Sequence, residues 1–314
     1  ADIGLIAVKA NTATAIADAA NTAEIVDASL TLVQKLLITS DATSYAVADV
    51  SKDIVSASGV GIGVNVLYAK AEGVFTALID GADVSVPNGY ITITNTYISK
   101  ASAKTAPPCD GLSLDINFLS VKTNLADAIV GTITRAGIKG TGDITTHTLT
   151  VSAVGTGTAD ASLATATVSA SAVDVAVNVT RAEVAADQMA AVEGENVTAT
   201  NTMSVLSTFN KNKDGESGIK GATASIGAAN GGKSDSFSVS MASVKANTAT
   251  ALITANVRAY VAAMNLNVAK SLTVKTDAIS YADAIVDSGL ANLSALNAAV
   301  LVTQADAGGV FSSS

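Results

Sequence analysis

Apolar and polar residues alternate strictly in several short stretches of this 314-residue chain. In residues 60–66, Val and Ile alternate with Gly and Asn, and in residues 173–179 four valines alternate with Asp, Ala and Asn. A period of two is typical of a β-strand with one buried face. We therefore expect strands in these stretches, with the valines pointing into the interior.

These stretches belong to a long internal repeat. Residues 244–251, Val-Lys-Ala-Asn-Thr-Ala-Thr-Ala, are identical to residues 8–15. Related copies begin at residues 64, 121, 177 and 300, so the spacing is nearly constant apart from one longer step between 177 and 244. A fixed period of this size indicates a repeat architecture. The pattern predicts an all-β fold in which residues 1–314 form one elongated β-solenoid, built from repeats of about 56 residues that are partial at both ends.

A second strand follows the start of each repeat at a constant distance of roughly 30 residues. It is centred on five apolar residues: Ile38, Ile93, Val151, Leu206 and Val274. The residues expected to point inward are Val64, Val66, Val177, Val179, Ile93 and Val274. If each solenoid rung takes about 18 to 20 residues, a repeat supplies about three rungs and the chain forms a rod of about 75 to 80 Å. Gly81 and Gly194, which occupy equivalent positions two repeats apart, are expected at turns that require a positive φ.

One segment allows a different interpretation. Residues 12–30 are rich in alanine, which favours a helix. The equivalent segments of other repeats contain glycine and β-branched residues, as in Gly73-Val74-Phe75-Thr76. Because repeats share one structure, the strand interpretation is preferred here.

Two stretches interrupt the repeat. Residues 104–111 contain two prolines next to Cys109, which predicts a loop because proline cannot donate to a strand ladder. Residues 210–236 contain the additional residues of the fourth repeat and are predicted to form an insertion loop. In this loop, Asn210, Asn212 and Asp214 have the spacing of half a calcium-binding loop, so they are weak metal candidates beside the alternative of a solvated loop.

Composition and charge exclude several functions. The net charge is −9 and only Arg135, Arg181 and Arg258 are arginines, which argues against a nucleic-acid partner. No apolar run is long enough to span a membrane. The single cysteine excludes an internal disulfide framework.

The motifs also carry a resemblance to a known group of proteins. Gly-Val-Gly-Ile-Gly-Val-Asn-Val at residues 59–66, Ile-Asp-Gly-Ala-Asp-Val at 79–84 and Ile-Thr-Ile-Thr at 91–94 resemble the repeat regions of large bacterial type V-secreted adhesins, the filamentous-haemagglutinin-like and leukotoxin-like group. The resemblance covers almost the whole chain. It implies a right-handed parallel β-helix that forms an extracellular or cell-surface shaft, without catalytic residues.

The remaining candidates for chemistry are few. His147 is the single histidine and has no evident partners for a catalytic set, so we expect a surface or groove residue. Cys109 is expected to be an inert thiol, with a reactive or cross-linking thiol as the alternative. No cofactor and no enzymatic activity are predicted. The expected role is the stalk of an adhesin or a surface fibre, and the alternatives are a glycan- or ice-binding module and a polysaccharide-active β-helix enzyme.

The repeat pattern also bears on partners. Ordinary repeat sequence reaches both ends of the chain, and open rungs favour pairing with further strands. We expect continuation within a longer polypeptide, with end-to-end or lateral self-assembly as the next possibility. A host receptor or a glycan is the other kind of partner expected for a shaft of this group.

Overall fold

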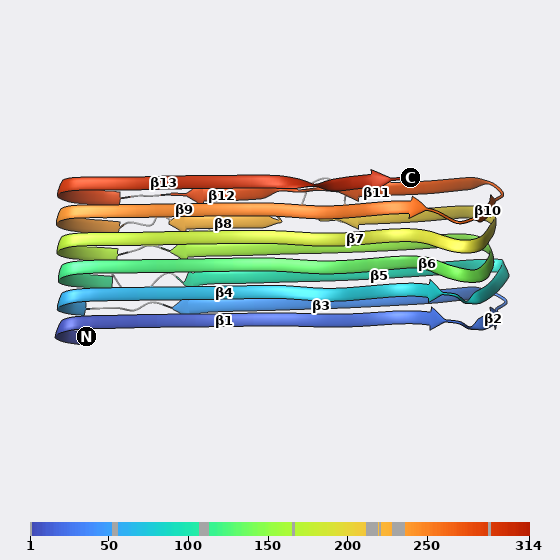
Figure 1. Ribbon diagram of the computed structural model, residues 1–314, viewed down its shortest axis with the longest axis horizontal. Helices are drawn as coiled ribbons and strands as arrows, with labels where there is room; N and C mark the ends of the chain where they lie inside the picture. The colour runs from blue at the N-terminus through green and yellow to red at the C-terminus, as the bar shows by residue number, and fades with distance from the viewer. Residues whose placement is uncertain are drawn as a thin grey trace.

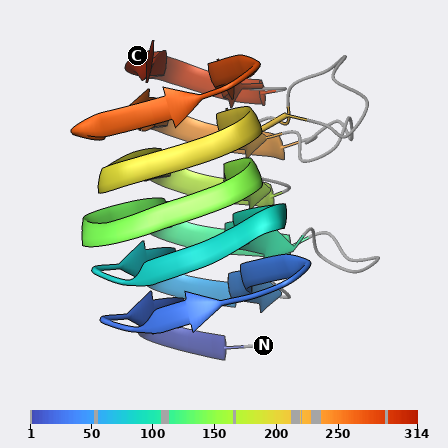
Figure 2. The same cartoon turned by 90° about the vertical axis from the view of Figure 1, so that its right-hand side faces the viewer.

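Two long β-layers face one another, and the chain winds around them in flat, stacked coils (Figures 1 and 2). The computed structural model describes residues 2–51, 56–106, 113–164, 167–211, 219, 221–227, 236–287 and 290–314. Every strand pair in this part of the chain is parallel. The predicted all-β parallel solenoid is confirmed.

The strands follow the chain in order around the coils. Their bounds are β1 Asp2–Val26, β2 Ser29–Thr31, β3 Lys35–Ser51, β4 Ser56–Asp80, β5 Asp83–Ala106, β6 Ser113–Ala164, β7 Thr167–Phe209, β8 Ala222–Gly227, β9 Ser236–Val261, β10 Asn265–Val268, β11 Ser271–Ala278, β12 Ala282–Val286 and β13 Leu290–Ser313. The front layer has the order β1-β4-β6-β7-β9-β13. The back layer contains β2, β3, β5, the second halves of β6 and β7, and the short strands β8, β10, β11 and β12.

One repeat forms one coil, so the expectation of three rungs per repeat is wrong. Asparagines paired between successive coils lie 54, 59, 54 and 69 residues apart in sequence. The 25-residue strands β1 and β4 each run about 80 Å at 3.3 Å per residue. Six stacked strands at about 4.8 Å spacing span only about 25 to 30 Å. The long dimension therefore follows the strands and not the stacking axis, because no turn interrupts these stretches.

The register between coils also differs from the sequence alignment. Val8 pairs with Ile62, and Ala10 pairs with Val64, so the repeat starts at residues 8 and 64 are offset by two positions. The pairing instead aligns the asparagine of each repeat, as in Asn11 with Asn65. A shift by two keeps every side chain on its own face of the sheet, so the alternation alone could not distinguish the two registers.

The inward-facing set was predicted with the wrong phase at the repeat starts. Val64, Val66, Val177 and Val179 are partly exposed and lie on the outer face, whereas the alternate residues Asn65 and Asn178 are buried. The buried asparagines bond to one another, which stabilises this phase in spite of the outward valines.

For the second strand of the repeat, the predicted inward residues are mostly confirmed. Ile93 is completely buried, and Val274 packs against the interior cluster as predicted. In the fourth repeat Val205, not Leu206, pairs with Val151 and Val274 and points inward. Both residues are apolar, so the sequence could not distinguish them.

The interior is thin and formed mainly by small side chains. Ala15, Ala69, Ala128, Ala182 and Ala251 follow one another up the stack through the pairing of β1, β4, β6, β7 and β9. Larger residues fill the wider parts of the interior; for example, the rings of Phe75 and Tyr97 stack with centroids 5.6 Å apart. Apart from Ala20, which is exposed, the alanines of residues 12–30 that suggested a helix are inward residues of β1 and of the turn that follows it. The strand interpretation was therefore right there up to Val26.

Turns join the front and back layers at one end of the coils. Gly81 has φ +62°, as predicted, and Asp27 occupies the equivalent position one coil below with φ +46°. Gly140 adopts φ +89° one coil above, but Gly194, which pairs with Gly140, does not adopt a positive φ. The prediction was therefore right for Gly81 and wrong for Gly194.

Candidate functional site

Five asparagine side chains, of which the last four are buried, form a ladder through five coils. Asn11 Nδ2 donates to Asn65 Oδ1 at 2.9 Å, and Asn65 donates to Asn124 at 2.5 Å. Asn124 donates to Asn178 at 2.6 Å, and Asn178 donates to Asn247 at 2.8 Å. Leu301 takes the next position, where the ladder ends. Each interior amide both donates and accepts along the stacking axis, which gives this column a structural role.

A polar cluster lies between the layers beside the ladder. Ser120, Asp174 and Ser243 pair in neighbouring strands, and none is more than 4% exposed. The oxygens Ser120 Oγ, Asp174 Oδ1 and Ser243 Oγ have no hydrogen-bond partner among the described residues. Burial lowers the pKa of the nearby Lys245, whereas the charge of Asp174 acts in the opposite direction. Buried polar groups of this kind are normally satisfied by ordered water.

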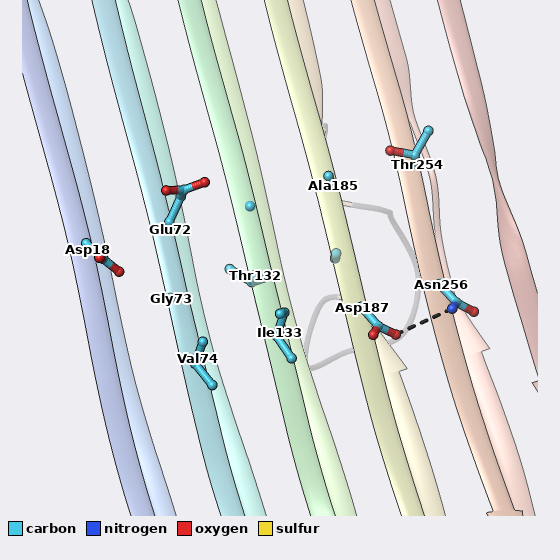
Figure 3. A pocket seen from close by; sticks show the side chains of 12 residues that line it. Asp18, Glu72, Gly73, Val74, Thr132, Ile133, Ala185, Asp187, Thr254 and Asn256 are labelled. Carbon is cyan, nitrogen blue, oxygen red and sulfur yellow. Dashed lines mark hydrogen bonds between the residues drawn. The ribbon is translucent and has the colours of Figure 1, made fainter.

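A shallow groove crosses the front layer from β1 to β9. Its volume is about 500 Å³, and Gly131 and Ala185 leave it open because their side chains are small. Carboxylates lie toward both ends of it: Asp18 and Glu72 on β1 and β4, and Asp187 on β7 (Figure 3). A second hollow of about 210 Å³ lies on the same face over Gly137, Ala191 and Lys139.

The acids of the groove have cationic or amide neighbours. Lys70 Nζ lies 2.7 Å from Glu72 Oε1. Arg135 lies 2.5 Å and Arg258 3.2 Å from the carboxylate of Asp187. Asn256 Nδ2 donates to Asp187 Oδ1 at 3.4 Å, as the dashed line in Figure 3 shows. Partial burial alone would raise the pKa of Asp187, but the hydrogen bonds and charges of the two arginines outweigh it and hold that pKa below its usual value. The groove therefore presents a charged carboxylate at neutral pH.

The metal candidates of the insertion loop are only partly described. Asn210 is completely buried with φ +51°, and its side chain accepts from Gly157 N at 2.8 Å and donates to Gly157 O at 3.1 Å. This amide therefore joins two coils instead of facing a solvated loop. Asn212 and Asp214 lie outside the described residues, as does Cys109. Among the residues that the structure describes, no three His, Cys, Asp or Glu side chains gather as a metal site would require.

His147 lies at the surface, on the back layer. It is exposed, and its Nδ1 lies 3.0 Å from Thr200 Oγ1 on the neighbouring coil. It was expected at the surface or in a groove, and the structure places it on the layer opposite the residues that line the front groove.

The groove itself was missed by the sequence analysis. Gly131 and Ala185 lie in successive repeats and become neighbours only once the asparagines, rather than the repeat starts, are aligned. A column of small residues flanked by acids would have been visible in that alignment.

Comparisons with known proteins do not identify a family. No family model, no curated protein and no solved structure matches this chain. In the described part of the chain, no helix is present that has the length and apolar character needed to cross a bilayer.

Proposed function

We propose that this chain is a structural shaft, a segment of an extracellular or cell-surface bacterial fibre or adhesin stalk. The observation that carries the proposal is the continuity of the ladders along the stacking axis. Front-layer strands pair over nearly their whole length from one coil to the next, as the register of β4 with β6 from Ser56 to Asp80 illustrates. The asparagine column adds side-chain bonds in the same direction.

This arrangement suits a load-bearing element. Many hydrogen bonds join each pair of neighbouring coils along the stacking axis, so a force in that direction is shared among them. Cross-strand ion pairs such as Lys139 with Asp80 at 2.9 Å add contacts between the same coils on the outer face. The resemblance to type V-secreted adhesins points to the same role and to a location outside the cell.

Immunogold electron microscopy on the native source tests this proposal. Antibodies raised against the folded chain are expected to label extended filaments or stalks outside the cell. Label confined to the cytosol, or to discrete globular particles, would contradict the shaft and its location.

A glycan-binding surface is the second candidate, because of the front groove. Glu72, Asp187, Thr254 and Asn256 present carboxylate, hydroxyl and amide groups that suit hydrogen bonds to sugar hydroxyls. A glycan array, with Asp187→Ala as the comparison, tests it. Binding that is lost in the variant would support this candidate, and an array without binding would exclude it for the glycans present.

A further inference from the structure

The front layer carries a large uncharged apolar surface at the end of the coils opposite the positive-φ turns. In each of its six strands, four alternate side chains point outward here. We call this surface the valine face, and it comprises Ile6, Val8, Ala10, Thr12, Val60, Ile62, Val64, Val66, Leu119, Val121, Thr123, Leu125, Val173, Val175, Val177, Val179, Ala242, Val244, Ala246, Thr248, Leu296, Ala298, Val300 and Val302. It contains no charged residue, and its few polar residues are threonines.

The surface continues around the adjacent corner of the coils. Leu5, Phe118 and Met241 are 87%, 70% and 65% exposed, and they occupy corresponding positions in their coils. Soluble monomers rarely expose contiguous apolar patches larger than a few hundred Å². A surface of this size therefore marks an interaction site.

The area of the valine face matches one side of a protein–protein interface. Seven residues along each strand span about 23 Å and six strands span about 29 Å, which gives a footprint of roughly 670 Å². A stable interface of standard size buries about 800 Å² on each partner. Asp127 and Arg181 lie 3.9 Å apart in the outward column next to the valine face, and these charged residues provide a polar rim for it.

We propose that the valine face pairs with the same face of a second copy of this chain. Its side chains form parallel columns of mostly β-branched residues at a uniform spacing, so the columns of one copy fit between those of another, as in a steric zipper. A twofold axis perpendicular to the face lets one patch serve both partners. Two chains of charge −9 can approach here because the face itself is uncharged.

A lipid surface is a poorer fit for the same face. Apolar surfaces that bind membranes normally combine with Lys, Arg and Trp. This chain has no Trp and a net charge of −9, and the lysines next to the face, such as Lys245, belong to the inward columns. The pairing deepens the proposed shaft function, because it joins two shafts side by side. The proposed pairing rests on the fold and not on the location of the protein.

Analytical ultracentrifugation of the folded 314-residue chain tests the pairing. The unmodified chain is expected to sediment at twice its 31.0 kDa mass. Val64→Glu combined with Val177→Glu introduces two carboxylates near the centre of the face and is expected to raise the dissociation constant at least about 100-fold. The matched control is Thr94→Glu with Leu206→Glu, which changes two outward residues of the back layer that are likewise separated by one strand.

Circular dichroism shows whether each variant keeps its β-sheet fold. If the valine-face variant fails to fold, Val177→Cys in a Cys109→Ser background replaces it. Oxidation is then expected to join two chains, whereas Thr150→Cys on the back layer gives no such product. A monomeric unmodified chain, or equal loss of pairing in the control variant, overturns the proposal. Binding to neutral vesicles by a monomeric chain would assign the face to lipid instead. Neither result would affect the immunogold test of the shaft.

Discussion

At the scale of single residues, asparagine determines how the coils align. Asn124 is 8% exposed, accepts from Asn65 and donates to Asn178, so its amide is used in both directions. The flanking residues Thr123 and Leu125 face outward. One buried polar position in each repeat thus fixes a register that the apolar alternation leaves open.

Replacing Asn124 with Leu is expected to destabilise the chain by about 1 to 3 kcal/mol. The substitution leaves the amide of Asn65 without its acceptor and the carbonyl of Asn178 without its donor, both in the interior. Chemical denaturation measures the change, with Thr123→Ala as the outward-facing control. Equal stability of the two variants would show that the ladder does not stabilise the fold.

The phase of the strands gives a second prediction at this scale. Val184→Asp is expected to destabilise the chain strongly, by several kcal/mol, because Val184 is 0% exposed and the new carboxylate would have no partner. Val177→Asp lies on the same strand but on the outer face, and it is expected to leave the thermal midpoint almost unchanged when it is compared with the unmodified chain at a dilution at which both are monomeric. A lower thermal midpoint for Val177→Asp than for Val184→Asp would show that Val177 points into the interior, as the sequence alternation suggested.

These residues also show what the sequence could and could not reveal. The alternation located the strands correctly, because period two is set by backbone geometry. It placed the valines inside because apolar side chains are usually buried, whereas here the inner side is taken by asparagine and alanine. The sequence also could not show that the side chain of Asn210, a weak metal candidate, bonds to Gly157 on a coil 53 residues away.

At the scale of the elements, some glycines inside strands leave the space that neighbouring large side chains occupy. A Cβ on Gly155 would lie 2.2 Å from Tyr97 Cε1 and 2.3 Å from Gln188 Oε1. Both neighbours are fully buried, so neither has room to move. A Cβ on Gly63 would meet nothing nearer than Lys122 Cγ at 3.9 Å.

Gly155→Ala is therefore expected to destabilise the fold by roughly 1 to 3 kcal/mol through overpacking. Gly63→Ala is the matched control and is expected to be neutral or stabilising by about 0.5 to 1 kcal/mol, because alanine suits a strand interior better than glycine. Thermal unfolding of the two variants measures both effects. A gain in stability for Gly155→Ala would mean that the stacked layers are more loosely packed than the structure shows.

The ion pairs of β6, β7 and β9 make stability depend on pH. Arg135 and Arg258 hold the pKa of Asp187 below its usual value of 3.8, so folding favours the charged form. The resulting stabilisation is present above the unfolded pKa and is lost as the pH falls through the lower folded pKa.

Asp187→Asn is accordingly expected to be less stable than the unmodified chain at neutral pH, with a difference that shrinks below about pH 4. Urea denaturation over a series of pH values measures this difference. A gap that stays constant down to the lowest pH would show that the carboxylate charge does not stabilise the fold.

At the scale of the whole molecule, the sequence shows a long repeat but does not show how each repeat folds. The sequence shows a regular long period, and each repeat could fold as several short rungs or as one long one. Each repeat forms one flat coil, because the inward residues of β4 are small or apolar from Leu67 to Ile79 and no turn interrupts the strand. The front groove follows from this choice, since its lining comes from five successive coils.

The coils differ in how completely they are paired, and hydrogen exchange is expected to report this. Among the strands that the structure describes, β6 and β7 have paired strands on both sides, whereas β1 pairs only with β4 and β13 only with β9. In a parallel strand, alternate amides bond to opposite neighbours, so alternate amides of β1 and β13 face away from their single partner.

We expect these alternate amides to exchange rapidly while their neighbours, and nearly all amides of β6 and β7, remain protected. Mass spectrometry with fragmentation at single-residue resolution measures the pattern on the monomeric Val64→Glu, Val177→Glu variant. Lateral pairing is then removed, and any protection of the outer strands comes from the stacking axis. Uniform slow exchange along β1 that disappears on dilution would reveal end-to-end stacking of the chains, because only a further parallel strand would protect the amides that β4 leaves unpaired.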